Sequence, residues 1–264
     1  MDYGKRLQLL VRFGYDGWRF HGLQPQADLP TAGAALYQRF IAAGVTPKAL
    51  CYSARTDAGV HAVRNIATLW LRGPVKLDAI IKAVGQERDD GLRQVSLERI
   101  PIHVHARSHA RGKHYRYHFV DACTSLPTIH GKLLKKSDAW EVYPRLDATL
   151  MHRAAQTLVG THDFSAFRVR RCGASDPIRT LSRLSVERCG ERIILDIHGR
   201  SFLRKMVRMI AGTLALVGAR WWDTRQVHSI LNSRDRQHAG PIAPAHGLTL
   251  MQVHFNWPET MTNI

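Results

Sequence analysis

The chain has few acidic residues and few cysteines, and it has no long apolar run. No stretch of about 18 consecutive apolar residues occurs, which excludes a transmembrane helix. Because the N-terminus shows no signal-peptide core, we expect a cytoplasmic protein. The scattered cysteines contain no C-x-x-C pair, so neither a disulfide framework nor a zinc site is predicted; they are Cys51, Cys123, Cys172 and Cys189.

Several common catalytic signatures are also missing. The sequence contains no Walker A loop, no G-x-G-x-x-G, no G-x-S-x-G and no H-E-x-x-H. His103 and His105 have the spacing of a shared strand face, but no carboxylate or cysteine nearby completes a set of metal ligands. An enzyme with this sequence therefore needs chemistry that runs without a nucleotide cofactor or a metal.

Positive charge is what the sequence has in excess. Lys and Arg number 38 against 21 Asp and Glu, which gives a net charge of +17 and a pI near 10.4. The excess runs along the whole chain rather than lying in one tail. This pattern favours a polyanionic partner, nucleic acid above all, over a generally basic enzyme.

Hydrophobic periodicity predicts an α+β fold with an antiparallel or mixed sheet. Thr31 is a candidate N-cap for a helix whose apolar stripe holds Leu36, Phe40 and Ile41. The pattern of strands and helices restarts near residue 146. We therefore expect an N-terminal half over 1–120, a C-terminal half over 146–264 and a connecting loop over 121–145. Strands are expected at 7–15, 49–54, 61–71, 92–98, 178–189, 192–198 and 248–255, and helices at 77–84, 146–159, 202–217 and 223–231.

Residues 102–119 alternate in a way that predicts two strands. In the first, His103, His105 and Arg107 alternate with apolar or small residues, and in the second Tyr115 and Tyr117 alternate with basic residues. Aromatic and basic side chains on a sheet are suited to stacking on bases and contacting phosphates.

Two charged residues are candidates for chemistry. Asp57 lies between two predicted strands beside Ala58-Gly59, where the backbone can turn tightly. Spacing alone fits an ordinary turn with a surface ion pair better than a catalytic acid. Arg204 and Arg208 are predicted on one helix face, either as a solvated basic face or with Arg208 reaching a buried carboxylate and keeping it ionised.

Five blocks in order make the chain resemble the bacterial tRNA pseudouridine synthase A family over nearly its full length. The second block, ARTDAGVHA over 54–62, is similar to the family's catalytic block. The others are Tyr15-Asp16-Gly17 with 22–26, His105-Ala106-Arg107 with 115–117, His162 to Arg168, and Phe202 with 206–208, 212, 217–218, 243–245 and 247–248.

The resemblance implies roles for particular residues. Asp57 matches the catalytic aspartate, Arg208 the arginine that pairs with it, and Tyr115 the tyrosine that packs against the target base. Arg55 matches an arginine associated with moving the base out of the RNA stack, and Leu248 an apolar residue of the uracil pocket. The expected substrate-binding residues are Arg55, Leu248, Tyr117, Arg107, Phe164 and Arg168.

The resemblance also implies a substrate and an assembly. Family members are homodimers that need no cofactor and modify uridines at positions 38 to 40 of the tRNA anticodon stem-loop. Their fold is a largely antiparallel sheet made from two similar α+β halves. The chain departs from the family pattern at Ala54, at Val104 and near residues 124–137, which bears on tRNA contacts and target preference.

Three alternatives stay open at this point. A non-catalytic RNA-binding module predicts decay of the acid, the tyrosine or the arginine, and all three are present. An RNA-cleaving enzyme would use His103 and His105 as acid and base and would shorten its RNA. A pseudouridine synthase for another RNA, such as ribosomal RNA, is excluded only by the family resemblance.

Overall fold

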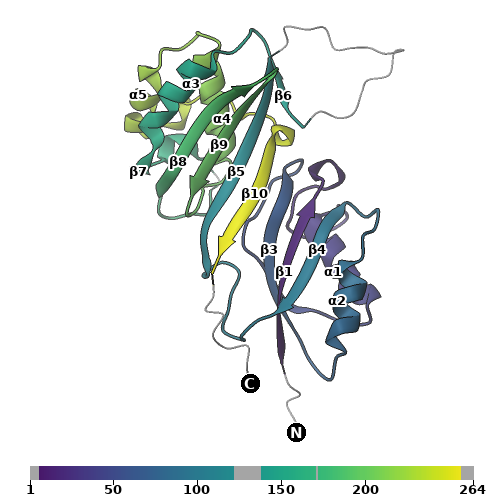
Figure 1. Ribbon diagram of the computed structural model, residues 1–264. Coiled ribbons are helices and arrows are strands. Elements are labelled where there is room, and N and C mark those ends of the chain that lie inside the picture. The colour runs from purple at the N-terminus through teal and green to yellow at the C-terminus, as the bar shows by residue number, and fades with distance from the viewer. Residues whose placement is uncertain (1–5, 122–137, 171, 257–264) are drawn as a thin grey trace, which may run out of the picture. The chain divides into compact units, whose positions relative to one another are not determined.

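The computed structural model describes residues 6–121, 138–170 and 172–256 of the 264-residue chain (Figure 1). The chain divides into two compact units. Unit 1 comprises Met1–Arg111 together with Leu250–Ile264, and unit 2 comprises Gly112–Thr249. Most of the expected connecting loop, including 124–137, lies outside the described residues. The division into halves at 1–120 and 146–264 stays a prediction.

Unit 1 is built on an antiparallel sheet. Its strands follow the order β4-β1-β3, and β2 pairs with β3. Helices α1 and α2 pack against each other and on β4 (Figure 1). The elements are β1 (Leu7–Tyr15), the short 3-10 helix η1 (Gly17–Arg19), α1 (Ala32–Ala42), β2 (Lys48–Tyr52), β3 (His61–Leu71), α2 (Leu77–Gly85) and β4 (Leu92–Arg99).

The first helix begins as predicted but buries a different set of side chains. The Thr31 hydroxyl accepts a hydrogen bond from the Ala34 N–H at 3.2 Å, which confirms the predicted N-cap. Leu36 and Phe40 are fully buried, whereas Ile41 is 40% exposed, so its place in the apolar stripe was wrong. The buried position beside Phe40 is taken by Arg39 instead.

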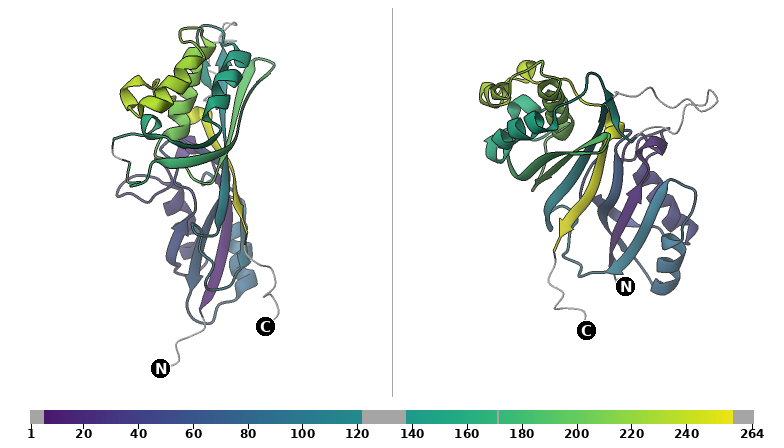
Figure 2. Two further views of the ribbon diagram at one scale, coloured as in Figure 1. Left: turned by 90° about the vertical axis from the view of Figure 1, so that its left-hand side faces the viewer. Right: turned by 45° about the horizontal axis from the view of Figure 1, so that its top comes forward.

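Unit 2 contributes an antiparallel set of strands, in the order β5-β9-β8-β7, with β6 parallel to β5. Helices α3, α4 and α5 cover one face of it (Figure 2). The elements are β5 (Ala110–Asp121), β6 (Trp140–Val142), α3 (Ala148–Ala155), η2 (Gln156–Leu158), β7 (Gly160–Asp163), η3 (Ser165–Phe167), β8 (Ile178–Cys189), β9 (Arg192–Gly199), α4 (Met206–Gly218), α5 (Arg225–Ser233), η4 (Arg236–His238) and η5 (Ala245–Gly247). The last strand, β10 (Leu248–Phe255), begins in unit 2 and belongs to unit 1 from Leu250 onward.

Alternation along β9 shows which side of this sheet forms the core. Ile193, Leu195 and Ile197 are fully buried, while Asp196 and His198 between them are only partly covered. Successive strand residues point to opposite faces, so the two sets lie on opposite sides of the sheet. Unit 2 therefore has one apolar, helix-covered face and one face that carries ionisable side chains.

Two sequence predictions fail locally. Residues 102–109, predicted as a strand, form turns, and β5 begins only at Ala110. The His109 N–H donates to the His105 carbonyl at 3.1 Å, and the His105 N–H donates to His109 Nδ1 at 3.1 Å. Because these N–H and carbonyl groups are bonded within the turn, they are not available for pairing with a neighbouring strand. The placement of Arg204 on the helix is also wrong, because α4 starts at Met206 after Lys205 adopts a φ of +62°.

The predicted α+β class with an antiparallel or mixed sheet is confirmed. The chain passes twice through the order strand–helix–strand–strand–helix–strand, first as β1-α1-β2-β3-α2-β4 and then as β5-α3-β8-β9-α4-β10, with β6, β7 and α5 added. Among the described residues, no helix combines the length and the apolar character needed to cross a membrane.

Candidate active-site residues

Asp57 lies on the loop between β2 and β3, residues 53–60, here named the Asp57 loop. Its turn is closed by a hydrogen bond from the Val60 N–H to the Asp57 carbonyl at 3.2 Å. The Gly59 N–H donates to the Phe20 carbonyl at 3.4 Å, and the Thr56 carbonyl accepts from the Leu23 N–H at 3.3 Å. The loop is thus bonded to the segment that follows β1, and its backbone is held on both sides of Asp57.

Gly22 lets that neighbouring segment approach. Its φ is +93°, and a Cβ placed there would lie 2.9 Å from the Thr56 carbonyl oxygen and 3.2 Å from the Ala58 nitrogen. A side chain would therefore be strained by its backbone conformation and would collide with the Asp57 loop. These contacts give a physical reason for the glycine that begins residues 22–26, one of the blocks that carry the family resemblance.

A buried polar cluster supports the loop from beneath. Tyr15 and Thr56 share a hydrogen bond between their hydroxyls at 2.8 Å, and Asn65 Nδ2 donates to the Ala54 carbonyl at 2.9 Å. The Asn65 side-chain oxygen accepts from the Ile66 N–H at 2.8 Å. Burial raises the pKa of Tyr15 to about 12, so its phenol stays neutral and able to donate.

The sequence reasoning missed Asn65 as a supporting residue. It is completely buried in β3, next to the fully or nearly fully buried Ile66 and Ala67. A buried asparagine needs hydrogen-bond partners, and here they are the Ala54 carbonyl of the Asp57 loop, the Tyr15 hydroxyl and the Ile66 N–H. An amide side chain directly before the largely apolar run 66–71 was the signal available in the sequence.

The other predicted residues of unit 1 lie near this loop or are bonded to its base. Arg55 is exposed on the Asp57 loop itself, and Asp57 is half-buried. Arg107 is exposed in the 102–109 turns, and its Nε donates to the Tyr52 carbonyl at 3.4 Å, at the end of β2. Unit 1 therefore contributes an acid and two exposed arginines to the candidate site.

In unit 2, Arg208 and Tyr117 hold the residues that lead into β10. Arg208 Nε donates to the Ala243 carbonyl at 2.7 Å, and the Ala243 N–H donates to the Arg208 carbonyl at 3.0 Å. The Tyr117 hydroxyl donates to the Pro244 carbonyl at 2.8 Å. Leu248, 6% exposed, begins β10 just after this stretch. The structure thus links three predicted site residues through one short segment, 243–248.

Two predicted aromatic residues on β5 are packed within unit 2. The Tyr115 ring meets the Phe202 ring edge-on, with centroids 5.2 Å apart, and Tyr115 is 7% exposed. Tyr117 is fully buried, and burial raises the pKa of its phenol, an effect that the charge of Arg208 partly opposes. Tyr117 is therefore a neutral donor inside the unit, two residues beyond the partly accessible Tyr115.

Phe164 and Arg168 flank η3. Phe164 is fully buried, with its ring centroid 6.0 Å from His162 and 6.1 Å from Phe167. Arg168 is half-buried and donates to the Ala174 carbonyl at 3.2 Å. Their contact with a substrate stays a prediction, and Phe164 is a buried packing residue rather than an exposed contact.

The histidines considered as metal ligands or as acid–base pairs have other contacts. Within residues 6–121, 138–170 and 172–256 no group of three or more His, Cys, Asp or Glu side chains is placed to hold a metal ion. His105 Nδ1 accepts from the Arg107 N–H at 3.3 Å. His114 stacks on His198 with ring centroids 4.0 Å apart and also bonds Asp196.

Comparison with known proteins identifies the family. The chain is 41% identical over 255 residues to a tRNA pseudouridine synthase A from Methylobacterium nodulans, an alignment that covers 96% of each chain. The chain belongs to the tRNA pseudouridine synthase A family. This family consists of isomerases, so the chain is an enzyme, and the predicted family and enzyme class are confirmed.

Further relatives agree with this membership. A tRNA pseudouridine synthase A from Xanthobacter autotrophicus is 37% identical, with 91% of this chain and 96% of the relative covered. Another from Maricaulis maris is 35% identical, with 94% and 98% covered. The family model described as a tRNA pseudouridine synthase matches residues 154–256, which begin in α3 and end just after β10.

Proposed function

We propose that the chain isomerises uridine to pseudouridine at positions 38 to 40 of the tRNA anticodon stem-loop, with Asp57 as nucleophile. It acts without a cofactor, as a homodimer, in the cytoplasm. The observation that carries the proposal is the Asp57 loop. In a member of this family, a half-buried carboxylate lies on a loop whose backbone is bonded on both sides to the segment after β1.

The reaction needs only groups that proteins supply. The N1–C1′ glycosidic bond breaks, the uracil turns, and C5 bonds to C1′, while the C5 hydrogen is lost and a proton is gained at N1. No atoms or electrons are gained or lost overall. An ionised carboxylate such as that of Asp57 can form the covalent intermediate that divides this exchange into easier steps.

Unit 2 supplies most of the remaining roles in this proposal, and Arg55 and Arg107 of unit 1 supply the others. Tyr115 is placed on β5 with its ring fixed edge-on by Phe202, which suits it to pack against an extruded base. Leu248 adds an apolar wall, and Arg208 keeps the acid ionised, because a nearby positive charge favours the carboxylate form. Arg55, Arg107, Arg168 and Tyr117 complete the substrate-binding set.

Tritium release tests reaction and nucleophile together. Unmodified tRNA labelled at uridine C5 loses tritium when C5 bonds to the sugar, so the wild type should release it. Asp57→Asn should release none, whereas Asp78→Asn, the same change at an exposed position of α2, should act like the wild type. No release by the wild type from any tRNA would refute the proposal.

The product separates the competing activities. Isomerisation leaves the RNA length unchanged, whereas cleavage by His103 and His105 would shorten it. Mapping the pseudouridines to positions 38–40 supports the anticodon stem-loop, and modification of ribosomal RNA alone would reject that substrate. Binding should also weaken steeply as salt rises, because contacts with phosphates release counterions; a flat salt response would contradict the role given to the basic surface.

A further inference from the structure

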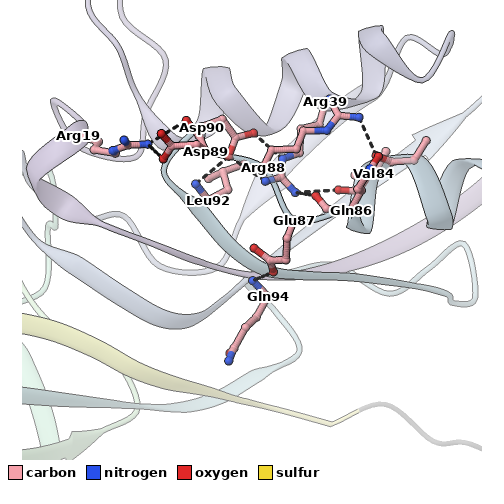
Figure 3. Close-up of polar contacts among 11 residues, drawn as sticks. Arg19, Arg39, Val84, Gln86, Glu87, Arg88, Asp89, Asp90, Leu92 and Gln94 are labelled. Carbon is pink, nitrogen blue, oxygen red and sulfur yellow. Dashed lines mark hydrogen bonds and ion pairs between the residues drawn. The ribbon is translucent and has the colours of Figure 1, made fainter.

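Arg39 is a buried arginine that the proposed chemistry does not use. Its side chain is only 2% exposed. Nε and one terminal nitrogen donate to the two oxygens of Asp90 at 2.6 and 2.8 Å, and the other terminal nitrogen donates to the carbonyls of Val84 and Gln86 at 2.9 and 3.0 Å (Figure 3). All nitrogens of the guanidinium are therefore engaged by residues 84–90.

The Arg39–Asp90 pair is ionised. Burial alone would raise the pKa of Asp90, but the hydrogen bonds from Arg39 and from the Leu92 N–H outweigh it and hold the pKa below its ordinary value. A buried ion pair adds little stability over well-packed apolar side chains. A two-bond arginine–carboxylate contact does fix geometry. The main effect of this pair is therefore to hold the residues bonded to it in place.

Asp90 lies in the segment between α2 and β4, residues 87–91, here named the 87–91 loop, and this loop holds η1. The Gly91 carbonyl accepts from the Asp16 N–H at 3.0 Å, just before η1 begins. Arg19, the last residue of η1, donates to the Asp89 carbonyl at 2.9 Å and forms an ion pair with the Asp89 carboxylate at 2.6 Å (Figure 3). Both ends of η1 are thus attached to the loop that Arg39 fixes.

In turn, η1 lies directly against the end of the Asp57 loop. The Gly17 N–H donates to His61 Nδ1 at 3.1 Å. A Cβ on Gly17 would lie 2.5 Å from the Val60 carbonyl carbon and 2.6 Å from the Gly59 carbonyl oxygen. The backbone of η1 at Gly17 is therefore packed directly on the backbone of Gly59 and Val60. A displacement of η1 is expected to move residues 59–61 with it.

We propose that Arg39 and Asp90 are positioning residues for the Asp57 loop. They act on Asp57 through the 87–91 loop and η1. The inference rests on the proposed role of Asp57. Neither side chain touches substrate, so loss of the pair leaves tRNA binding nearly intact and slows the chemical step. A misplacement of about 1 Å in a reacting group can cost about a hundredfold in rate.

The experiment compares Asp90→Asn and Arg39→Met with a control, Asp223→Asn. Asp223 also pairs with an arginine, Arg225, at 3.0 Å, but both are exposed and lie in unit 2. Single-turnover tritium release gives the chemical step, and filter binding gives the tRNA Kd. We expect a rate loss of about tenfold for Asp90→Asn and more for Arg39→Met, with Kd within about twofold. The control should match the wild type in both.

Hydrogen–deuterium exchange of peptides covering residues 54–61 is measured in the same variants without tRNA. Faster exchange there in Asp90→Asn than in Asp223→Asn supports the proposal even if the wild type proves inactive on tRNA, so the two proposals can fail separately. If Arg39→Met does not fold, the single-turnover rate and the exchange of residues 54–61 are compared in Asp90→Asn and in Asp89→Asn, at an exposed position, instead. Wild-type rate and wild-type exchange in Asp90→Asn would show that the pair is only structural and would overturn the inference.

Discussion

The two units hold their candidate residues by different means. In unit 1, Asp57 lies on an irregular loop whose backbone is fixed by hydrogen bonds from the segment after β1, such as that between Gly59 and Phe20. In unit 2, Tyr115 and Arg208 lie on a regular strand and a regular helix. The position of a loop residue depends on distant partners, whereas the position of a strand or helix residue depends mainly on its own element.

The surroundings of these residues differ in the same sense. Beneath the Asp57 loop, Tyr15, Thr56 and Asn65 form a polar cluster in which each member needs the others. The Tyr115 ring is packed edge-on against the ring of Phe202. We therefore expect changes in several residues of unit 1 to reach the Asp57 carboxylate.

The largest effect is expected for Asp57→Asn. This change removes the charge and hardly alters the shape, so turnover should fall by on the order of a thousandfold or more. Binding of tRNA and the unfolding midpoint should stay near the wild-type values. Single-turnover kinetics, filter binding and thermal unfolding measure the three quantities, and a parallel loss of binding and activity would instead assign Asp57 a folding role.

Arg208→Met tests whether the unit 2 arginine acts on the acid. Loss of its charge should lower the single-turnover rate by roughly a hundredfold, while filter binding of tRNA stays near the wild-type value. Arg208→Lys keeps the charge and should keep most of the rate. A rate as low in Arg208→Lys as in Arg208→Met would limit Arg208 to its bond with the Ala243 carbonyl.

Asn65→Leu tests the polar cluster of unit 1. It leaves the Ala54 carbonyl and the Ile66 N–H without the partners described above, which should cost about 1–3 kcal/mol of unfolding free energy. Because the cluster supports the Asp57 loop, the rate should also fall when measured well below the unfolding midpoint. Gln38→Leu on exposed α1 is the control. A variant that loses stability but reacts at the wild-type rate would show that the polar cluster does not determine the position of the Asp57 loop.

The smallest effect is expected on the ionisable face of unit 2. Burial raises the pKa of Asp196, but hydrogen bonds from His114 and Arg116 outweigh it and lower the pKa to about 2. The ionised form therefore stabilises the fold above the ordinary aspartate pKa, by about 1 kcal/mol after solvent screening, and this is lost as pH falls toward 2.

Urea unfolding of the wild type and of Asp196→Asn measures the stability that the ionised Asp196 carboxylate contributes. The wild type should be the more stable protein at pH 7, and the difference should shrink as pH falls from about 4 toward 2. Turnover at neutral pH should be unchanged, because the effect stays local. A difference that is constant over this pH range would mean that packing rather than charge explains the effect of the substitution.

Regular elements were the part of the fold that the sequence predicts well. The ranges for β1, β3, β8 and β10 were predicted to the residue, because alternation and turn residues mark their ends. Alternation failed at 102–109, where histidine side chains bond the backbone and turns replace a strand. Periodicity also carried the helical pattern of α4 back to 202, since it does not register the positive φ of Lys205.

The support of the candidate site was much less predictable. Local pattern made Asp57 and Arg208 candidates, but spacing favoured an ordinary turn for Asp57, and only the family resemblance assigned the two residues their roles. Arg39 was missed because it occupies a core position of α1 that periodicity reserves for an apolar residue. Its partner Asp90 is 51 residues away in sequence, and only the folded chain brings the two together.

Unit 1 is discontinuous, and this has a consequence for biosynthesis. Residues 112–249 are all made before Leu250, the residue at which the chain returns to unit 1. Leu250 and Val253 are 0% and 3% exposed, so the core of unit 1 is incomplete until they have been translated. Chains generally fold domain by domain on the ribosome, but the first 111 residues of this chain cannot complete their unit before the last strand has been made.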